Sequence, residues 1–161
     1  MHLVVEPFRN MRSTSAGFTL IETLVVVALV AVVAGISAPI VAGGMARYSL
    51  TTTGQQIAST IRSARFQAVG RNTDVRVVFD ADAGSFEKEA WDSDTMTWVA
   101  IDSALTLPSG VSFADDVPAN VEFESDGRLP AGAAATAIGV IDDYGATRTI
   151  TVQPNGRIQL Q

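Results

Sequence analysis

The sequence predicts an α+β protein in which a long N-terminal helical stalk, membrane-spanning in its first part, packs on a C-terminal antiparallel β domain. The first observation behind this prediction is an apolar run over 18–42, followed by a segment whose apolar residues recur at helical spacing. The second is a change of period near Arg71, after which apolar and polar residues alternate. Turn signals also recur there about every ten residues, as expected of short strands joined by hairpins.

The apolar run over 18–42 is predicted to be a transmembrane helix. As a helix its 25 residues would reach ~37 Å, and the hydrocarbon layer of a bilayer is ~30 Å thick. Arg9 and Arg12 precede the run, so the positive-inside tendency keeps the N-terminus cytoplasmic and sends the C-terminal domain across the membrane. Glu22 is the only charged residue within the run. Because a carboxylate at bilayer depth costs about 2.5–3.5 kcal/mol, we expect Glu22 to have a function and a cationic partner.

Beyond the membrane, the stalk is predicted to continue as an amphipathic helix over 43–70. Pro39 removes a backbone hydrogen bond and is expected to kink the helix, the alternative being a simple helix end. A local break is expected at 51–54, where Thr-Thr-Thr-Gly has low helix propensity, and Gly70 stands where a C-terminal cap belongs. The residues of the predicted buried face are Leu50, Ile57, Ile61, Ala64 and Ala68.

The segment 71–161 is predicted to be an antiparallel β domain. Its strongest turn signals are Asp-Gly at 126–127 and Asn-Gly at 155–156, the dipeptides that most often close a tight hairpin. Trp91 and Trp98 flank another predicted turn, so we expect them to meet across a hairpin and stabilise the sheet. The predicted strands cover 75–79, 85–91, 97–101, 111–114, 121–124, 136–141, 147–153 and 157–161.

The composition argues against catalysis and against a cofactor. The chain has no Cys, which excludes disulfides, thiol nucleophiles and Cys-based metal sites, and its one histidine, His2, precedes the apolar run. The formal net charge of −6 argues against broad binding of nucleic acid, which depends on basic surfaces that displace counterions. We therefore expect neither an enzyme nor a bound cofactor or metal.

Several acidic residues lie close together around the predicted turn at Gly84. An EF-hand loop that began at Asp80 would need its glycine at the sixth position and a glutamate at the twelfth. Here Gly84 is fifth and Trp91 is twelfth, so the pattern fails. We interpret these carboxylates as turn residues, a role that Asp favours, and bound calcium is the open alternative.

The residues at 17–22, Gly-Phe-Thr-Leu-Ile-Glu, followed by a long apolar run, resemble the class III signal of type IV pilins and of the pseudopilins of type II secretion. The resemblance implies that 1–17 is a leader, which prepilin peptidase removes by cutting between Gly17 and Phe18. It also implies that Phe18 is N-methylated and that Glu22 acts in subunit assembly. The physics agrees, because the new Phe18 amine of one subunit could neutralise the buried Glu22 of its neighbour.

Two similar stretches, Ser-Asp-Gly-Arg-Leu-Pro at 125–130 and Pro-Asn-Gly-Arg-Ile-Gln-Leu at 154–160, each place Arg and an apolar residue after a turn. With a stalk helix before the sheet, they resemble the GspH/FimT group of minor pseudopilins. This resemblance implies a pilin-like fold, with two small sheets, in a single-pass inner-membrane protein whose C-terminal domain is periplasmic. It implies assembly with other pseudopilins into a short pseudopilus for protein export. The other implied partners are prepilin peptidase, the inner-membrane assembly platform and membrane lipid.

The alternative function is that of a FimT-like minor type IV pilin, which binds DNA for uptake. FimT-side members tend to end in Gly-Arg-x-Arg, and here the residues at 156–159 supply only the first arginine, Arg157. Arg148 lies on the strand predicted to pair across the 155–156 turn and could partly replace the second arginine. A third interpretation, a periplasmic enzyme that merely uses this anchor, is disfavoured by the missing Cys and His.

Overall fold

The computed structural model describes the backbone of residues 17–161 and the side chains of 17–36 and 43–161. The predicted leader up to residue 16 lies outside the described residues, and so does the side chain of Pro39, where a kink is predicted. Within the described range, one long helix, α1 (Leu20–Arg71), is followed by nine short strands. In chain order the strands are β1 (Val75–Asp80), β2 (Ser85–Asp92), β3 (Thr97–Ala100), β4 (Leu105–Thr106), β5 (Val111–Phe113), β6 (Asn120–Phe123), β7 (Thr136–Asp142), β8 (Thr147–Val152) and β9 (Ile158–Leu160).

The chain divides into two compact units, Met1–Pro39 and Ile40–Gln161, and α1 contributes to both. In the described part of the first unit, every side chain of α1 is exposed, with large apolar residues from Val25 (50%) to Leu20 (82%). Among the described residues, no helix combines the length and the apolarity needed to cross a membrane.

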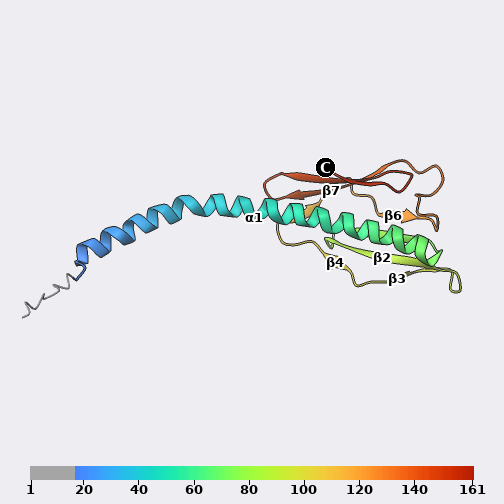
Figure 1. The fold of residues 1–161 in the computed structure, drawn as a ribbon, viewed down its shortest axis with the longest axis horizontal. Coiled ribbons are helices and arrows are strands. Elements are labelled where there is room, and N and C mark those ends of the chain that lie inside the picture. Colours follow the sequence, from blue (N-terminus) through green and yellow to red (C-terminus); the bar gives the residue numbers. More distant parts are fainter. Residues whose placement is uncertain (1–16) are drawn as a thin grey trace, which may run out of the picture. The chain divides into compact units, whose positions relative to one another are not determined.

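In the second unit, α1 packs one face against the β domain (Figure 1). The predicted face is confirmed, because its five members are all buried. The break predicted at 51–54 is wrong, since α1 is continuous there. Packing overrides the low helix propensity: Thr53 is buried, and a Cβ on Gly54 would lie 3.3 Å from Leu160 Cδ1. The chain needs a small residue at Gly54 because β9 passes close to the helix.

The helix α1 ends at Arg71, and its capping residue, Asn72, lies two residues beyond the predicted cap. Gly70 is still helical, and Asn72 adopts the left-handed conformation with φ 52°. The amide of Thr73 donates to the carbonyl of Ala68 at 3.2 Å, the long bond of a Schellman motif. The assignment of Gly70 as the cap is therefore wrong, because Asn tolerates the left-handed region and fills the same role.

The strands form two antiparallel sheets. One sheet has the order β3-β2-β1-β6, with β4 paired to β2, and the other has the order β5-β7-β8-β9. All eight predicted strands are confirmed within one residue at each end. The sequence analysis missed only β4 among these nine, because its two residues are too few to show alternation.

The core lies where α1 and the inner faces of both sheets meet. Figure 1 shows the second half of α1 running alongside the sheet that holds β2 and β3 and alongside the sheet that holds β7. Phe79 of β1, Phe86 of β2 and Phe113 of β5 join the two sheets, with ring centroids 5.7–6.5 Å apart. Such tilted and edge-on aromatic pairs add to the stabilisation that comes from burial alone.

Candidate functional site

Gly17 and Phe18, the predicted cleavage site, precede the helix, and Phe18 is 82% exposed. Thr19 caps α1: its hydroxyl accepts from the amide of Glu22 at 3.3 Å, and its carbonyl accepts from the amide of Thr23 at 3.1 Å. Threonine at the cap and glutamate three residues later have the spacing of a capping box. Cleavage and methylation at Gly17 and Phe18 stay predictions.

Glu22 lies in the first turn of α1, where the helix dipole favours a negative charge. Its side chain is exposed, and no ion pair to it forms within the described residues. The local structure therefore gives Glu22 a role at the helix start that the sequence analysis missed, although Thr19 and Glu22 carried the signal. The pairing of Glu22 with a neighbouring subunit stays a prediction.

The two similar stretches noted in the sequence form two copies of one turn. In each, an Asx side chain accepts from the amide of the arginine two residues on: Asp126 from Arg128 at 2.9 Å and Asn155 from Arg157 at 3.0 Å. In each, the glycine between them has positive φ, and the residues on either side of the turn are joined by a 2.8 Å backbone bond, from Glu124 to Arg128 and from Gln153 to Arg157. Thus the sequence similarity corresponds to a shared local geometry.

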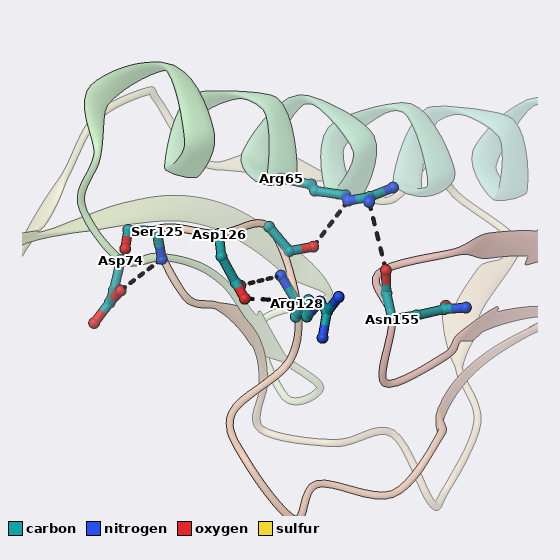
Figure 2. Close-up of polar contacts among 7 residues, drawn as sticks. Arg65, Asp74, Ser125, Asp126, Arg128 and Asn155 are labelled. Carbon is teal, nitrogen blue, oxygen red and sulfur yellow. Dashed lines mark hydrogen bonds and ion pairs between the residues drawn. The ribbon is translucent and has the colours of Figure 1, made fainter.

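Arg65 of α1 joins the two turns (Figure 2). Its Nε donates to the carbonyl of Gly127 at 2.8 Å, and one of its terminal nitrogens donates to the carbonyl of Asn155 at 3.4 Å. The amide of Leu129 also donates to the carbonyl of Pro154 at 3.1 Å, which links the turns directly. One helix side chain therefore holds together the turn that follows β6 of the first sheet and the turn between β8 and β9 of the second sheet.

This close approach requires glycine in both turns. A Cβ on Gly156, whose φ is 77°, would clash with the carbonyl oxygen of Gly127 and lie 2.6 Å from Arg65 Nε. A Cβ on Gly127, whose φ is 78°, would lie 2.8 Å from a methyl group of Val69. Glycine is favoured in both turns because the backbone has positive φ there, and also because the side chains of α1 lie too close for a Cβ.

Arg157 lies at a cavity of about 410 Å³, which we call the arginine pocket. Arg62, Arg65 and Phe66 line it from α1, and Arg157 lines it from the turn before β9. The complete lining is Arg62, Arg65, Phe66, Asn155, Gly156, Arg157 and Ile158. The sequence analysis did not predict that the helix arginines lie near Arg157, because contacts between residues so distant in the chain leave no pattern in the local sequence.

The structure does not bring Arg148 to Arg157. The carbonyl of Arg157 accepts from the amide of Gln153, whereas Arg148 is five residues further back on the same side of the hairpin. Five residues of extended chain span ~16 Å. The side chain of Arg148 instead lies near Gly54 of α1. DNA contact by either arginine stays a prediction, and the two cannot act as one patch.

Acidic residues occupy turns, as interpreted from the sequence. Asp80 accepts from the amide of Ala83 at 2.8 Å, so its carboxylate stabilises the β1–β2 turn. The amide of Asp94 and the hydroxyl of Thr95 both donate to Asp92, and these bonds hold the pKa of Asp92 below its ordinary value. Among the described residues, no three acidic or histidine side chains are placed to hold a metal ion together.

The predicted tryptophan pair is confirmed. Trp91 and Trp98 face each other across β2 and β3, with ring centroids 5.5 Å apart and an edge-on geometry. The guanidinium of Arg76 lies 4.3 Å from the ring centroid of Trp98 and also bonds Glu89 at 2.6 Å. Beside them, desolvation and the nearby charge of Asp74 raise the pKa of Glu122.

A buried lysine escaped the sequence analysis. Lys88 points inward from β2, is 8% exposed, and pairs with Asp102 at 2.5 Å and with the hydroxyl of Ser63 at 3.1 Å. The alternation of β2, in which Phe86 and Ala90 are buried, places Lys88 on the inner face. The alternation of β2 was therefore sufficient to predict that Lys88 faces inward. The long lysine stem can be buried while the ammonium group reaches Asp102.

Two family models match the chain. Residues 12–38 match the prokaryotic N-terminal methylation motif, which includes Gly17, Phe18 and Glu22. Residues 53–157 match the type II transport protein GspH, which covers most of the second unit. The chain belongs to the GspH family.

Solved structures share this pilin-like fold. The minor pseudopilin EpsH of the type 2 secretion system of Vibrio cholerae is similar with a TM-score of 0.58 and 15% identity, over 70% of this chain and 96% of that one. The type IV minor pilin FimU of Pseudomonas aeruginosa is similar with a TM-score of 0.59 and 15% identity, over 71% and 90%. At such identities the likeness shows the fold alone. No curated protein matches the sequence.

The two matched ranges contain most of the residues described above. The methylation motif contains the predicted cleavage site and the start of α1. The GspH match contains Arg62, Arg65 and both turns, and it ends at Arg157. The chain thus shares its family with the type II transport protein GspH, and its fold with a minor pseudopilin and a type IV minor pilin.

Proposed function

We propose that this chain is a minor pseudopilin of a type II secretion system, assembled in a short periplasmic pseudopilus that serves protein export. The observation that carries the proposal is the presence of both matches in one chain, a methylation motif over 12–38 and a GspH domain over 53–157. The first supplies the means of membrane entry and processing, and the second supplies the exported β domain.

The N-terminal unit acts as the anchor and the assembly element. Prepilin peptidase cuts between Gly17 and Phe18, and Phe18 is then N-methylated. Cleavage leaves an amine at the membrane surface, and the Phe18 amine of one subunit pairs with Glu22 of its neighbour. Because a carboxylate in lipid is costly without a partner, this pairing favours one axial register.

The exposed apolar side chains of the first unit support a location in the inner membrane. Within the described part of this unit no side chain is buried, so lipid or the helices of other subunits must cover Leu20, Val25 and the residues between and beyond them. The single pass leaves the N-terminus cytoplasmic and the β domain in the periplasm. The role is structural rather than catalytic, and the assembly platform of the inner membrane is the further partner.

Mass spectrometry of the purified membrane form tests the processing step. We expect a chain that begins at methylated Phe18, whereas a chain that is uncut at Gly17, or that begins beyond Pro39, contradicts the proposal. Glu22→Val should leave leader removal intact and impair entry into the filament, measured by the amount recovered in sheared pseudopili. Normal assembly of Glu22→Val would show that the pairing is wrong.

The alternative function, a minor type IV pilin that binds DNA for uptake, has one observation in its favour: Arg157 lies beside Arg62 and Arg65. Gel shifts with the fragment 47–161 at low and moderate salt test it. Salt-sensitive binding that is lost in Arg157→Ala and kept in Arg148→Ala would support DNA binding. An absence of binding at low salt would remove this alternative. Loss of exported proteins rather than of DNA uptake, when the gene is deleted, would favour the pseudopilin.

A further inference from the structure

The arginine pocket holds three cationic groups that lack a counter-charge. Arg76, Lys88 and Arg128 each pair with a carboxylate. No carboxylate among the described side chains forms an ion pair with any of the pocket's three arginines. The same holds for Arg47, Arg71 and Arg148, but only the pocket arginines line one cavity together. In a protein of net charge −6, an uncompensated cluster of guanidinium groups is unexpected unless a partner supplies the anion.

The pocket is held in a fixed geometry. Arg65 is partly buried and uses two of its five N–H groups on the carbonyls of Gly127 and Asn155, which leaves three donors for a ligand. Gly156, which is buried at the base of the turn, fixes the start of β9 and thus the position of Arg157. Phe66, 75% exposed, adds an apolar wall beside these charges. Fixed donors beside an exposed aromatic ring suit a specific contact.

The surroundings favour a compact anion over a long one. Asn155 also lines a neighbouring cavity, whose other lining residues include Glu124 and the ion pair between Asp126 and Arg128. An extended phosphate backbone that crossed Asn155 would meet Glu124, and the net negative charge of the protein would repel a long polyanion more than one or two carboxylates. One or two carboxylates on a polypeptide fit a cavity of about 410 Å³ without reaching Glu124.

We propose that the arginine pocket is a docking site for a carboxylate-bearing segment of another filament subunit. Arg62 and Arg157 approach the segment from the helix and from the turn, Arg65 binds a carboxylate through its free donors, and Phe66 covers the apolar part of the segment. The inference rests on the proposed function, because only an assembling subunit meets such a partner in the periplasm. Planar guanidinium groups match carboxylates better than ammonium groups would.

Photo-crosslinking in the native host tests the proposal on the full-length chain. Phe66 is replaced by the photoreactive aromatic residue p-benzoylphenylalanine, and adducts are identified by mass spectrometry. We expect an adduct with a pilin-fold subunit, at a peptide with Asp or Glu beside the attachment point. The yield should fall several-fold in the double variant Arg62→Glu and Arg157→Glu, and also in the milder Arg157→Gln. Arg148→Glu, which makes outside the pocket the charge change of one of the two glutamate substitutions, should leave the yield unchanged.

Other outcomes overturn the proposal. These are the absence of an adduct, a yield that is insensitive to the Arg62 and Arg157 substitutions, an adduct at a peptide without acidic residues, and a nuclease-sensitive adduct, which would indicate nucleic acid. Leader removal and membrane association are measured on the same samples. A failure of these two readouts would count against the proposed function, whereas a processed, membrane-bound chain without the expected adduct counts against the docking site alone.

Discussion

The two turns at 125–128 and 154–157 share a backbone and differ in one functional group. Each turn contains a glycine at positive φ. In each turn the backbone amide of the arginine donates a hydrogen bond to the side-chain oxygen of the Asx residue. In the first turn the Asx residue is Asp126, whose second oxygen lies 3.7 Å from Arg128 Nε. In the second it is Asn155, which has no charge to offer, and Arg157 forms no ion pair with the described side chains.

This difference shows how one turn can serve structure and the other recognition. A carboxylate and an amide accept the same backbone hydrogen bond, so the fold does not distinguish them. They differ only in whether the neighbouring arginine is neutralised. The second turn thus adds a free cation to Arg62 and Arg65, whereas the first turn keeps its arginine paired. Substitutions that exchange or disrupt these features test the comparison.

The largest effect is expected from Gly156→Ala. The left-handed backbone costs an L residue about 1–2 kcal/mol, and the new methyl group would clash with the Gly127 carbonyl and with Arg65. We expect a loss of about 4 kcal/mol or more, because backbone of the other turn must move. Urea unfolding of the fragment 47–161, which contains the whole buried core, measures it. An unchanged midpoint would show that the turns do not need this contact.

Gly127→Ala should cost less, about 2 kcal/mol, from the same left-handed strain plus one displaced side chain. Its new methyl group would meet Val69, which is exposed and can change rotamer. Gly145→Ala is the matched control, since its φ is 81° and no atom lies within 4 Å of a Cβ there. If Gly127→Ala and Gly145→Ala lose the same free energy of unfolding, contact with α1 contributes nothing at Gly127.

Arg65→Met keeps the apolar stem and removes the bonds to both turns. Hydrogen bonds from charged donors contribute about 1.5–3 kcal/mol, and partial solvent access places this loss near the lower value. Arg62→Met, on the same helix but without a hydrogen bond or ion pair among the described residues, should change the free energy of unfolding by less than about 0.5 kcal/mol. Equal losses from the two variants in urea unfolding would contradict the joining role of Arg65.

Exchanging the Asx residues should change recognition with little change in stability. Asn155→Asp keeps the acceptor for the Arg157 amide and adds a charge that pairs with Arg157, so we expect less adduct at position 66. Asp126→Asn releases Arg128 and should leave that adduct unchanged. Both variants should unfold within about 0.5 kcal/mol of wild type, because exposed ion pairs contribute little. If the adduct yield is unchanged in Asn155→Asp, Arg157 does not take part in the docking site.

The smallest effect is expected at Glu122, outside both turns. Its pKa is raised by desolvation and by Asp74, so the fold favours the protonated form. That contribution is fully present below the unfolded pKa, near 4.5, and is lost as pH rises through the higher folded pKa. Glu122→Gln should therefore raise the free energy of unfolding slightly at pH 7, by less than about 0.5 kcal/mol, and give no advantage at pH 4. A larger stabilisation by Glu122→Gln at pH 4 than at pH 7 would contradict the raised pKa of Glu122.

Local sequence signals were sufficient for most of the fold. The alternation of β2, the buried helix face that includes Ile57 and Ile61, and the Asp-Gly and Asn-Gly turns all depend on residues a few positions apart. The motif at 17–22 likewise carries its signal in adjacent residues. Such patterns are readable because helices and strands repeat every 3.6 and 2 residues, whatever lies beside them.

Contacts between distant segments were decided only by the tertiary structure. The helix is continuous through 51–54 because β9 packs on Gly54, and Arg65 serves two turns that lie 62 and 90 residues away in sequence. Arg148 and Arg157 look equivalent in the sequence, yet opposite ends of one hairpin keep them apart. Sequence alone determined the elements and the motif, whereas the assembly of the arginine pocket depended on long-range packing, which has no period along the chain.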